Sequence, residues 1–218
     1  MTIRACAIAL LPLLTAPALA EDMSCSTFSP DTTLAQIEDK YGKDNVVTGD
    51  VDGPEGTTMV ATTVFPKDET RKFEVYWFDE DKRTGFAGFT LPPDATGPGG
   101  IKISMAIKDV EKINGKPFIV GGFYWDYGGG ANFSGGKLEN KDDAACFMGV
   151  TFAPSVETTS QQIGDAISGE KDLKSNMKEF AVVKPVVQSV NLSLPDPNEG
   201  EDDSPENDGS DGGDVPAD

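Results

Sequence analysis

The alternation of hydrophobic and polar residues predicts β-strands over much of the chain. In residues 73–78 the side chains of Phe73, Val75 and Trp77 face one side of an extended chain, and the intervening residues face the other. This period of two is typical of a strand with one buried face. Similar extended segments are expected at residues 45–51, 57–65, 71–79, 117–127, 131–138 and 145–152.

Two short segments have the hydrophobic spacing of amphipathic helices. Residues 34–43 and 107–116 align at a constant offset of 73 positions, and each has a glycine, Gly42 or Gly115, where a helix C-cap is expected. Extended segments follow both. The chain therefore shows a weak internal repeat of a helix followed by strands.

The region after these repeats predicts one more helix and a last strand. The helix is expected within residues 158–178, with an interruption near Gly169. The strand is expected over residues 180–194. Pro185 favours an edge position for this strand, because proline cannot donate a backbone hydrogen bond to a neighbour.

Together these elements predict an α+β fold with antiparallel strands, since the connections are short. We expect two tandem helix-plus-antiparallel-β-meander units, residues 21–95 and 96–195, that form one compact body. Residues 91–100 are rich in proline and glycine and have the composition of a linker between the units. A body of about 170 residues suits a single domain.

Residues 1–20 have the pattern of a secretory signal peptide. A short basic start precedes an apolar run that is too short to span a bilayer, and Ala18-Leu19-Ala20 forms an A-x-A cleavage site before Glu21. No second apolar run of spanning length occurs in the sequence. We therefore expect an exported, soluble protein, periplasmic or secreted, without a membrane span.

Removal of the signal peptide leaves two cysteines, Cys25 and Cys146. An even number of cysteines in an oxidising compartment indicates a disulfide. Closing a loop of about 120 residues contributes about 4–5 kcal/mol by the chain-entropy argument. The alternative is two unrelated buried thiols.

The helix-Gly-x-Pro element at residues 110–117 and its echo at Tyr41-Gly42-Lys43 resemble the repeats of the β-lactamase-inhibitor-like fold and of BamE-type outer-membrane assembly proteins. The resemblance covers residues 30–152 and implies tandem helix-plus-antiparallel-sheet repeats. The chain departs from both groups. It lacks the lipobox cysteine of the BamE-type proteins, and two cysteines cannot supply one disulfide to each inhibitor-like repeat.

Charge divides the chain into a body and an acidic tail. The whole chain carries 37 acidic and 18 basic residues, a net charge of −19. Ten of the acidic residues lie in residues 196–218, which contain no basic or aromatic residue and are predicted to be disordered. Residues 21–195 keep a net charge of −10, which disfavours a nucleic-acid partner.

The sequence contains no histidine. This excludes Ser-His-Asp and Cys-His enzymes and any imidazole-bound metal. The Ser-x-x-Lys matches at Ser168 and Ser175 have no partner motifs, and the calcium-loop start Asp50-Val-Asp52 lacks ligands at the first and twelfth positions. We therefore expect neither a cofactor nor a metal site.

The densest chemical feature is the run of aromatic residues and glycines at residues 121–130. Its aromatic faces could stack on a sugar or form a protein-binding hot spot, and its carboxylate could accept hydrogen bonds. The alternative is a central strand in which Phe123, Trp125 and Tyr127 fill the core. The candidate ligand-binding residues are Tyr124, Trp125, Asp126 and Tyr127.

A pair of carboxylates would instead make this region a glycosidase. Asp126 could pair with Glu74 or Asp79, but nothing in the sequence brings these residues together. The charged run at residues 79–83 has the composition of a solvated hairpin loop.

We therefore expect a non-enzymatic binding or accessory module of the bacterial cell envelope, which binds a protein or a glycan through an aromatic-rich sheet surface. The first alternative is a carbohydrate-active hydrolase that uses Asp126 and a second carboxylate. The second is an envelope accessory protein whose tail only keeps it soluble.

Overall fold

The computed structural model of the chain describes residues 21–141 and 145–197. The predicted signal peptide and, from residue 198 on, the predicted disordered tail lie outside these residues. No helix in the described ranges is long and apolar enough to cross a membrane. The helices are α1 (Leu34–Tyr41), α2 (Ile107–Asn114), α3 (Gln161–Ile167) and α4 (Phe180–Val183), and the 3-10 turns are η1 (Lys43–Asn45), η2 (Pro54–Gly56) and η3 (Pro98–Gly100).

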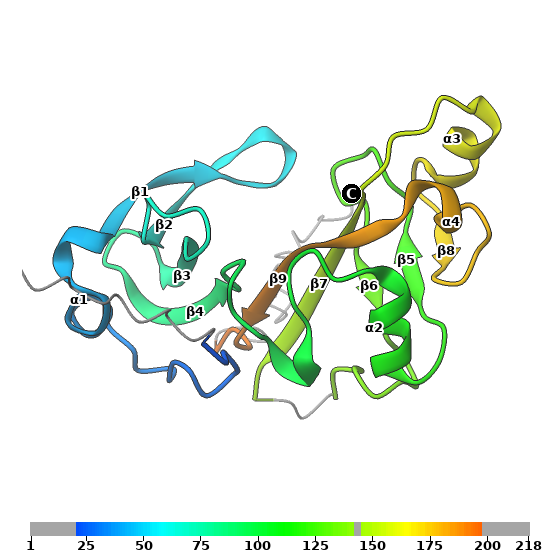
Figure 1. Cartoon of the computed structure of the whole chain (residues 1–218). Coiled ribbons are helices and arrows are strands. Elements are labelled where there is room, and N and C mark those ends of the chain that lie inside the picture. The colour runs from blue at the N-terminus through cyan, green and yellow to red at the C-terminus, as the bar shows by residue number, and fades with distance from the viewer. Residues whose placement is uncertain (1–20, 142–144, 198–218) are drawn as a thin grey trace, which may run out of the picture.

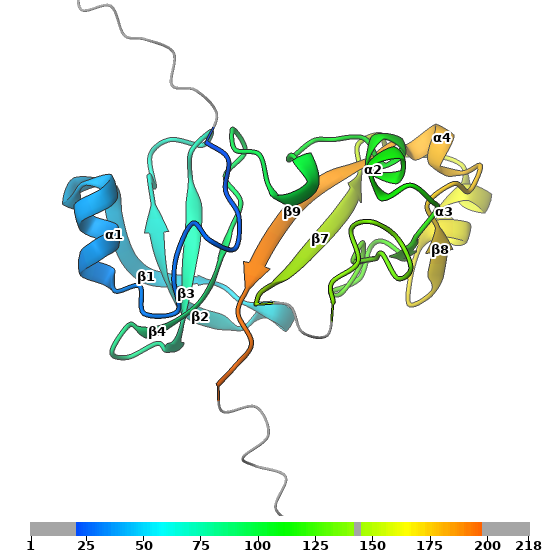
Figure 2. The ribbon, with the colours of Figure 1, turned by 90° about the horizontal axis from the view of Figure 1, so that it is seen from below.

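The strands form a six-stranded sheet of order β1-β2-β3-β4-β9-β7 and a three-stranded sheet of order β6-β5-β8. Figures 1 and 2 show α1 with β1–β4 at one end, the small sheet with α3 and α4 at the other, and β9 and β7 between them. The strands are β1 (Val46–Asp52), β2 (Thr58–Val64), β3 (Phe73–Asp79), β4 (Thr84–Thr90), β5 (Ile119–Gly121), β6 (Ala131–Asn132), β7 (Phe147–Pro154), β8 (Asp172–Lys174) and β9 (Pro185–Ser193).

The predicted α+β fold with antiparallel strands is confirmed. In the first half, α1 is followed by the four-stranded meander β1–β4. In the second half, α2 is followed by strands that divide between the two sheets. Strands β7 and β9 extend the meander through the β4–β9 pairing, whereas β5, β6 and β8 form the small sheet. The two halves therefore share one sheet.

Helices α1 and α2 end at the glycines that their sequences predict. Thr33 begins α1 with a capping box, in which its hydroxyl accepts from Gln36 N and its own N–H donates to Gln36 Oε1. Gly42 is the C-cap of α1, and its N–H donates to Glu38 O. Gly115 ends α2 in the left-handed region, at φ 81°.

The three strands predicted for the first half are present, with small shifts at their ends. The alternation in β3 is also confirmed, because Phe73, Val75 and Trp77 are buried. Strand β4 was not predicted. Its sequence Thr-Gly-Phe-Ala-Gly-Phe-Thr contains two glycines, which weaken the strand pattern, and it is held by pairing with β3 and β9.

The prediction that the last strand lies at a sheet edge is wrong. Strand β9 lies between β4 and β7, inside the six-stranded sheet. Pro185 is tolerated there because it is the first residue of the strand and pairs with Pro154, the last residue of β7. The residues before it form α4, and Lys184, with φ 45°, turns the chain into β9.

Aromatic side chains fill the core of the first half. Phe28, in the segment before α1, lies with its ring centroid 6.3, 5.2 and 5.1 Å from those of Phe73, Phe86 and Phe89. Trp77 is also buried, and its Nε1 donates to Thr62 Oγ1 over 3.0 Å. The indole N–H is thereby satisfied inside the core.

The second half has a smaller aromatic core beneath the three-stranded sheet. The ring of Phe118 lies 4.7 Å from that of Phe133 and 5.7 Å from that of Phe152 in β7. The ring of Phe123 lies 5.8 Å from that of Phe180 in α4. The Phe118–Phe152 contact therefore joins the start of β5 to the large sheet, and the Phe123–Phe180 contact joins the chain after β5 to α4.

The predicted disulfide partners Cys25 and Cys146 lie at disulfide distance. Their Cα atoms are 5.8 Å apart, and 121 positions separate them along the chain. Cys25 belongs to the segment before α1, and Cys146 directly precedes β7. The pair therefore connects the first half to the second.

Candidate functional site

The aromatic run that we predicted as a strand is mostly a loop. Strand β5 ends at Gly121, and residues 122–129, which we name the aromatic loop, leave the sheet. Phe123 N donates to Ile167 O over 2.7 Å, so the backbone takes a new partner at the end of α3. The prediction of a strand over residues 117–127 is therefore wrong beyond Gly121.

The alternation of side chains breaks at Tyr124. Its φ of 63° lies in the left-handed region, which a bulky residue seldom adopts and which is associated with functional sites. Phe123 is 3% exposed, whereas Tyr124, Trp125 and Tyr127 are 55%, 37% and 56% exposed. The alternative, in which Phe123, Trp125 and Tyr127 all fill the core, therefore holds only for Phe123.

Backbone hydrogen bonds attach the aromatic loop to the sheets at both of its ends. Gly122 N donates to Lys171 O over 2.8 Å, in the segment that leads into β8. Phe152 N, in β7, donates to Gly129 O over 2.8 Å. The exposed side chains therefore project from a backbone that is fixed on two sides.

Two glycines allow this close attachment. A Cβ atom at Gly129, whose φ is 81°, would overlap the carbonyl oxygen of Phe152. A Cβ atom at Gly122 would overlap the carbonyl oxygen of Gly169. Only a residue without a side chain fits either position.

Trp125 and Tyr127 support one another on the exposed side of the loop. Trp125 Nε1 donates to Gly122 O over 2.8 Å, and the two rings meet edge to face with centroids 5.6 Å apart. Gly128 N donates to Trp125 O over 3.0 Å and closes the turn between them. Because the indole N–H is bonded within the loop, the exposed part of Trp125 is aromatic carbon, which suits stacking.

The β1–β2 hairpin contacts the aromatic loop through Glu55. This residue lies in η2, at the tip of the β1–β2 hairpin, and has φ 56°. Tyr127 Oη donates to Glu55 Oε1 over 2.7 Å, across 72 positions of sequence. The hydrogen bond, with a smaller effect of Asp126, raises the pKa of Tyr127.

Carboxylates surround the exposed aromatic residues. Partial burial and the neighbouring Glu157 raise the pKa of Tyr124. Asp126 is exposed on the loop itself, between Trp125 and Tyr127. The site therefore combines aromatic faces with the carboxylates of Glu55, Asp126 and Glu157.

The structure does not give Asp126 the partners that we considered for a hydrolase. Glu74 Oε2 accepts from Tyr76 Oη over 2.6 Å, and Asp79 Oδ2 accepts from Lys82 Nζ over 2.7 Å. Both carboxylates are thus engaged within β3 and its following turn. Glu55 and Glu157, which do lie beside the loop, carry no signal in the sequence that would single them out.

Among the residues that the structure describes, no group of three or more histidine, cysteine, aspartate or glutamate side chains is placed to hold a metal ion. No protein-family model, no curated protein and no solved structure matches the chain. The resemblance to inhibitor-like and BamE-type repeats therefore remains a likeness of short sequence elements. The interpretation of the site depends on its own geometry.

Proposed function

We propose that the protein is an exported, non-enzymatic binding module of the bacterial cell envelope, which holds a protein or a glycan against its aromatic loop. The proposal depends on one observation: Tyr124, Trp125 and Tyr127 are exposed on a backbone that is fixed at both ends. Clustered exposed aromatic residues are typical of interaction sites. A fixed backbone lowers the entropy that binding must remove.

The chemistry of the loop limits the kind of partner. Aromatic faces contact the C–H face of a sugar ring or an apolar side chain, and the nearby carboxylates accept hydrogen bonds from hydroxyl or cationic groups. Polyanions are disfavoured by the net charge of −10 on residues 21–195. The partner in this proposal is an envelope protein or a neutral or basic glycan.

Two features support a periplasmic or secreted location. Residues 1–20 have the signal-peptide pattern. The Cys25–Cys146 pair lies at disulfide distance, and such pairs form and persist in oxidising compartments.

Binding to an envelope extract and to a glycan array tests the proposal with matched variants. Trp125→Ala removes the central aromatic face, and we expect binding to fall by about tenfold or more. The control Val182→Ala truncates a residue of α4 that is 44% exposed and should bind as the wild-type protein does. A folded Trp125→Ala variant that keeps all partner binding contradicts the proposal.

The same screen distinguishes binding from hydrolysis. Glycans that bind should be recovered intact. Turnover of a glycan that Asp126→Asn abolishes, in a variant that still folds, would replace the binding module by a carbohydrate-active hydrolase.

A further inference from the structure

A cavity of about 220 Å³ lies in the first half of the molecule. It is formed where the end of α1, the β2–β3 connection and the chain after β4 meet the residue Glu21. Its lining combines three aromatic residues with three charged residues and a proline. The lining residues used below are Glu21, Tyr41, Phe65, Arg71, Phe73 and Asp94.

The hydroxyl of Tyr41 is an unusual part of this wall. Tyr41 Oη is shielded from solvent and makes no hydrogen bond of normal geometry with the described residues. Burial raises the pKa of this hydroxyl, and the nearby Lys40 ammonium opposes that rise. The Lys40 ammonium lies over the Tyr41 ring, 4.8 Å from its centroid, and is bound to Glu21 over 3.3 Å. Lysine can only donate a hydrogen bond, so the Tyr41 O–H proton still lacks an acceptor. Buried polar groups nearly always have a partner, so this proton beside a cavity points to a ligand that accepts it.

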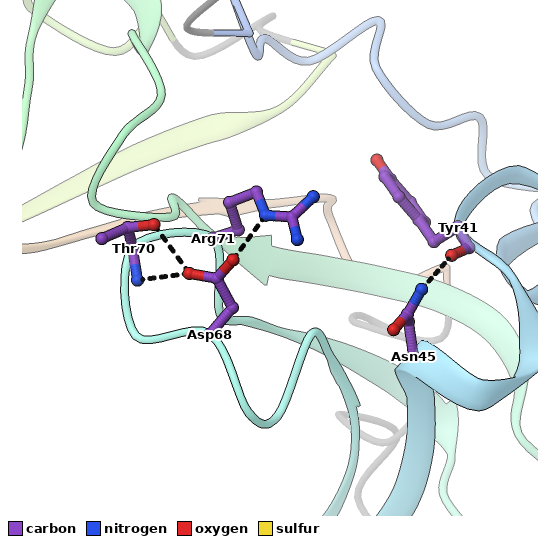
Figure 3. A network of polar contacts seen from close by, with 5 residues as sticks. All are labelled: Tyr41, Asn45, Asp68, Thr70 and Arg71. Carbon is purple, nitrogen blue, oxygen red and sulfur yellow. Dashed lines mark hydrogen bonds and ion pairs between the residues drawn. The ribbon is translucent and has the colours of Figure 1, made fainter. Parts of the chain in front are cut away.

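The Arg71 guanidinium is held by Asp68 and Phe65, and Arg71 also lines the cavity. Its Nε donates to Asp68 Oδ2 over 2.7 Å, and its guanidinium carbon lies 4.1 Å from the centroid of the Phe65 ring. A hydrogen bond from the Thr70 hydroxyl, followed by the bond from Arg71, lowers the pKa of Asp68 to about 2. In Figure 3 the terminal nitrogens of Arg71 point away from Asp68, toward the side on which the Tyr41 ring lies.

Phe65 is held in a strained backbone conformation beside this guanidinium. Its φ of 53° lies in the left-handed region, which is rare for a bulky residue and clusters at ligand sites. Phe65 N donates to Asn45 O over 2.7 Å, and Phe65 O accepts from Asp68 N over 3.0 Å. These bonds fix the ring between Arg71 and Tyr41, whose ring meets it edge to face at 5.7 Å.

We propose that this cavity binds a free α-amino acid with an apolar side chain. The planar fork of Arg71 and the hydroxyl of Tyr41 pair with the carboxylate, in the bidentate manner that arginine favours. The rings of Tyr41, Phe65 and Phe73 form the apolar part of the lining, against which the side chain lies. The cavity volume is below the ~300–1,000 Å³ typical of pockets for drug-sized ligands, which suits so small a ligand.

Charge favours an amino acid over a simple carboxylic acid. Arg71 is paired with Asp68 and Glu21 with Lys40, whereas Asp94, which also lines the cavity, has no ion-pair partner among the described residues. A free acid would bring a second carboxylate near Asp94 without a cation for it. The ammonium group of an amino acid instead interacts with the Asp94 carboxylate and cancels the charge of its own carboxylate.

Isothermal titration of the purified protein with L-leucine and L-phenylalanine tests this proposal. Arg71→Gln removes the fork, and the dissociation constant should rise by about tenfold or more. Tyr41→Phe removes only the hydroxyl and should raise it by about five- to tenfold. The control Arg83→Gln changes an arginine in the β3–β4 turn, at the opposite end of β3, and should bind as the wild-type protein does.

Two partial ligands separate the contributions of the two charged groups. The acid without the amino group and the amine without the carboxylate should each bind at least about tenfold more weakly than the amino acid. No binding of either amino acid at millimolar concentration overturns the proposal, as does unchanged affinity in Arg71→Gln. Trp125→Ala should bind the amino acids normally, so a failure here is distinct from a failure of the aromatic-loop proposal.

Discussion

The two halves of the molecule place their aromatic residues in opposite ways. In the first half, the rings of Phe28, Phe73 and Phe89 pack together inside the fold. In the second half, an equally aromatic stretch sends Phe123 inward and exposes the aromatic residues that follow it. The difference shows that alternation predicts burial only as far as a strand continues to pair with its neighbours.

The same difference separates the two candidate sites. The cavity beside Tyr41 lies among element ends that the aromatic core of the first half fixes in place. The aromatic loop lies on the surface and is fixed by backbone hydrogen bonds and by Glu55 from the other half. The first arrangement suits a small enclosed ligand, and the second suits a larger partner that covers a surface.

The largest expected effect concerns the covalent link between the halves. Replacing both cysteines, Cys25→Ser together with Cys146→Ser, should lower the free energy of unfolding by about 4–5 kcal/mol, because the closed loop spans 121 positions. Urea unfolding of the oxidised wild-type protein and the double variant measures this loss.

A reductant is the control for this comparison. It should destabilise the wild-type protein to the level of the double variant and leave the double variant unchanged. Each half contains one tryptophan, Trp77 or Trp125, whose fluorescence shows whether both halves unfold in one transition. Two reactive thiols in the native, unreduced protein would contradict the disulfide.

Two adjacent glycines test how the aromatic loop is held. Gly129→Ala should destabilise the protein by about 3 kcal/mol, because Gly129 has φ 81° and a Cβ atom there would overlap Phe152 O. Gly130→Ala is the matched control, since a Cβ atom at Gly130 meets nothing within 4 Å, and its effect should stay within about 0.5 kcal/mol. Thermal unfolding of both variants gives the comparison, and equal losses would show that the attachment to β7 is not specific.

Much of the first half could be predicted from its sequence because the signals there are local. Period-two alternation predicted β3, and Gly42 and Gly115 predicted the ends of α1 and α2. The central position of β9 could not be predicted from Pro185. A proline is disfavoured in the interior of a central strand but is tolerated at the first residue, which is where Pro185 lies. Strand β4 depends on partners on both sides, which no local pattern reveals.

The candidate site also combines features that local sequence predicts with features that depend on distant contacts. The composition of residues 121–130 predicted exposed aromatic residues on a sheet surface, whereas the structure exposes them on a loop. The change from strand to loop depends on contacts with Ile167 and Lys171, more than forty positions away, so the local pattern could not predict it. Glu55 became part of the site only through folding of the hairpin toward the loop.

The smallest expected effect concerns the hydrogen bond between the halves. Glu55→Gln removes the negative charge beside the Tyr127 hydroxyl, and the pKa of Tyr127 should fall toward its usual value of 10. Because the raised pKa favours the protonated phenol in the folded state, the contact stabilises the protein below pH 10. That stabilisation is lost as the pH rises through the raised pKa.

Tyrosinate absorbance during an alkaline titration measures this shift, and a double-mutant cycle assigns it. All four tyrosines have raised pKa values, so the wild-type curve should lie above the usual range. Glu55→Gln should move about a quarter of the absorbance change to lower pH, and the same substitution in a Tyr127→Phe background should move none. A shift that persists without Tyr127 would show that Glu55 acts on another tyrosine and that the hairpin does not contact the aromatic loop through this bond.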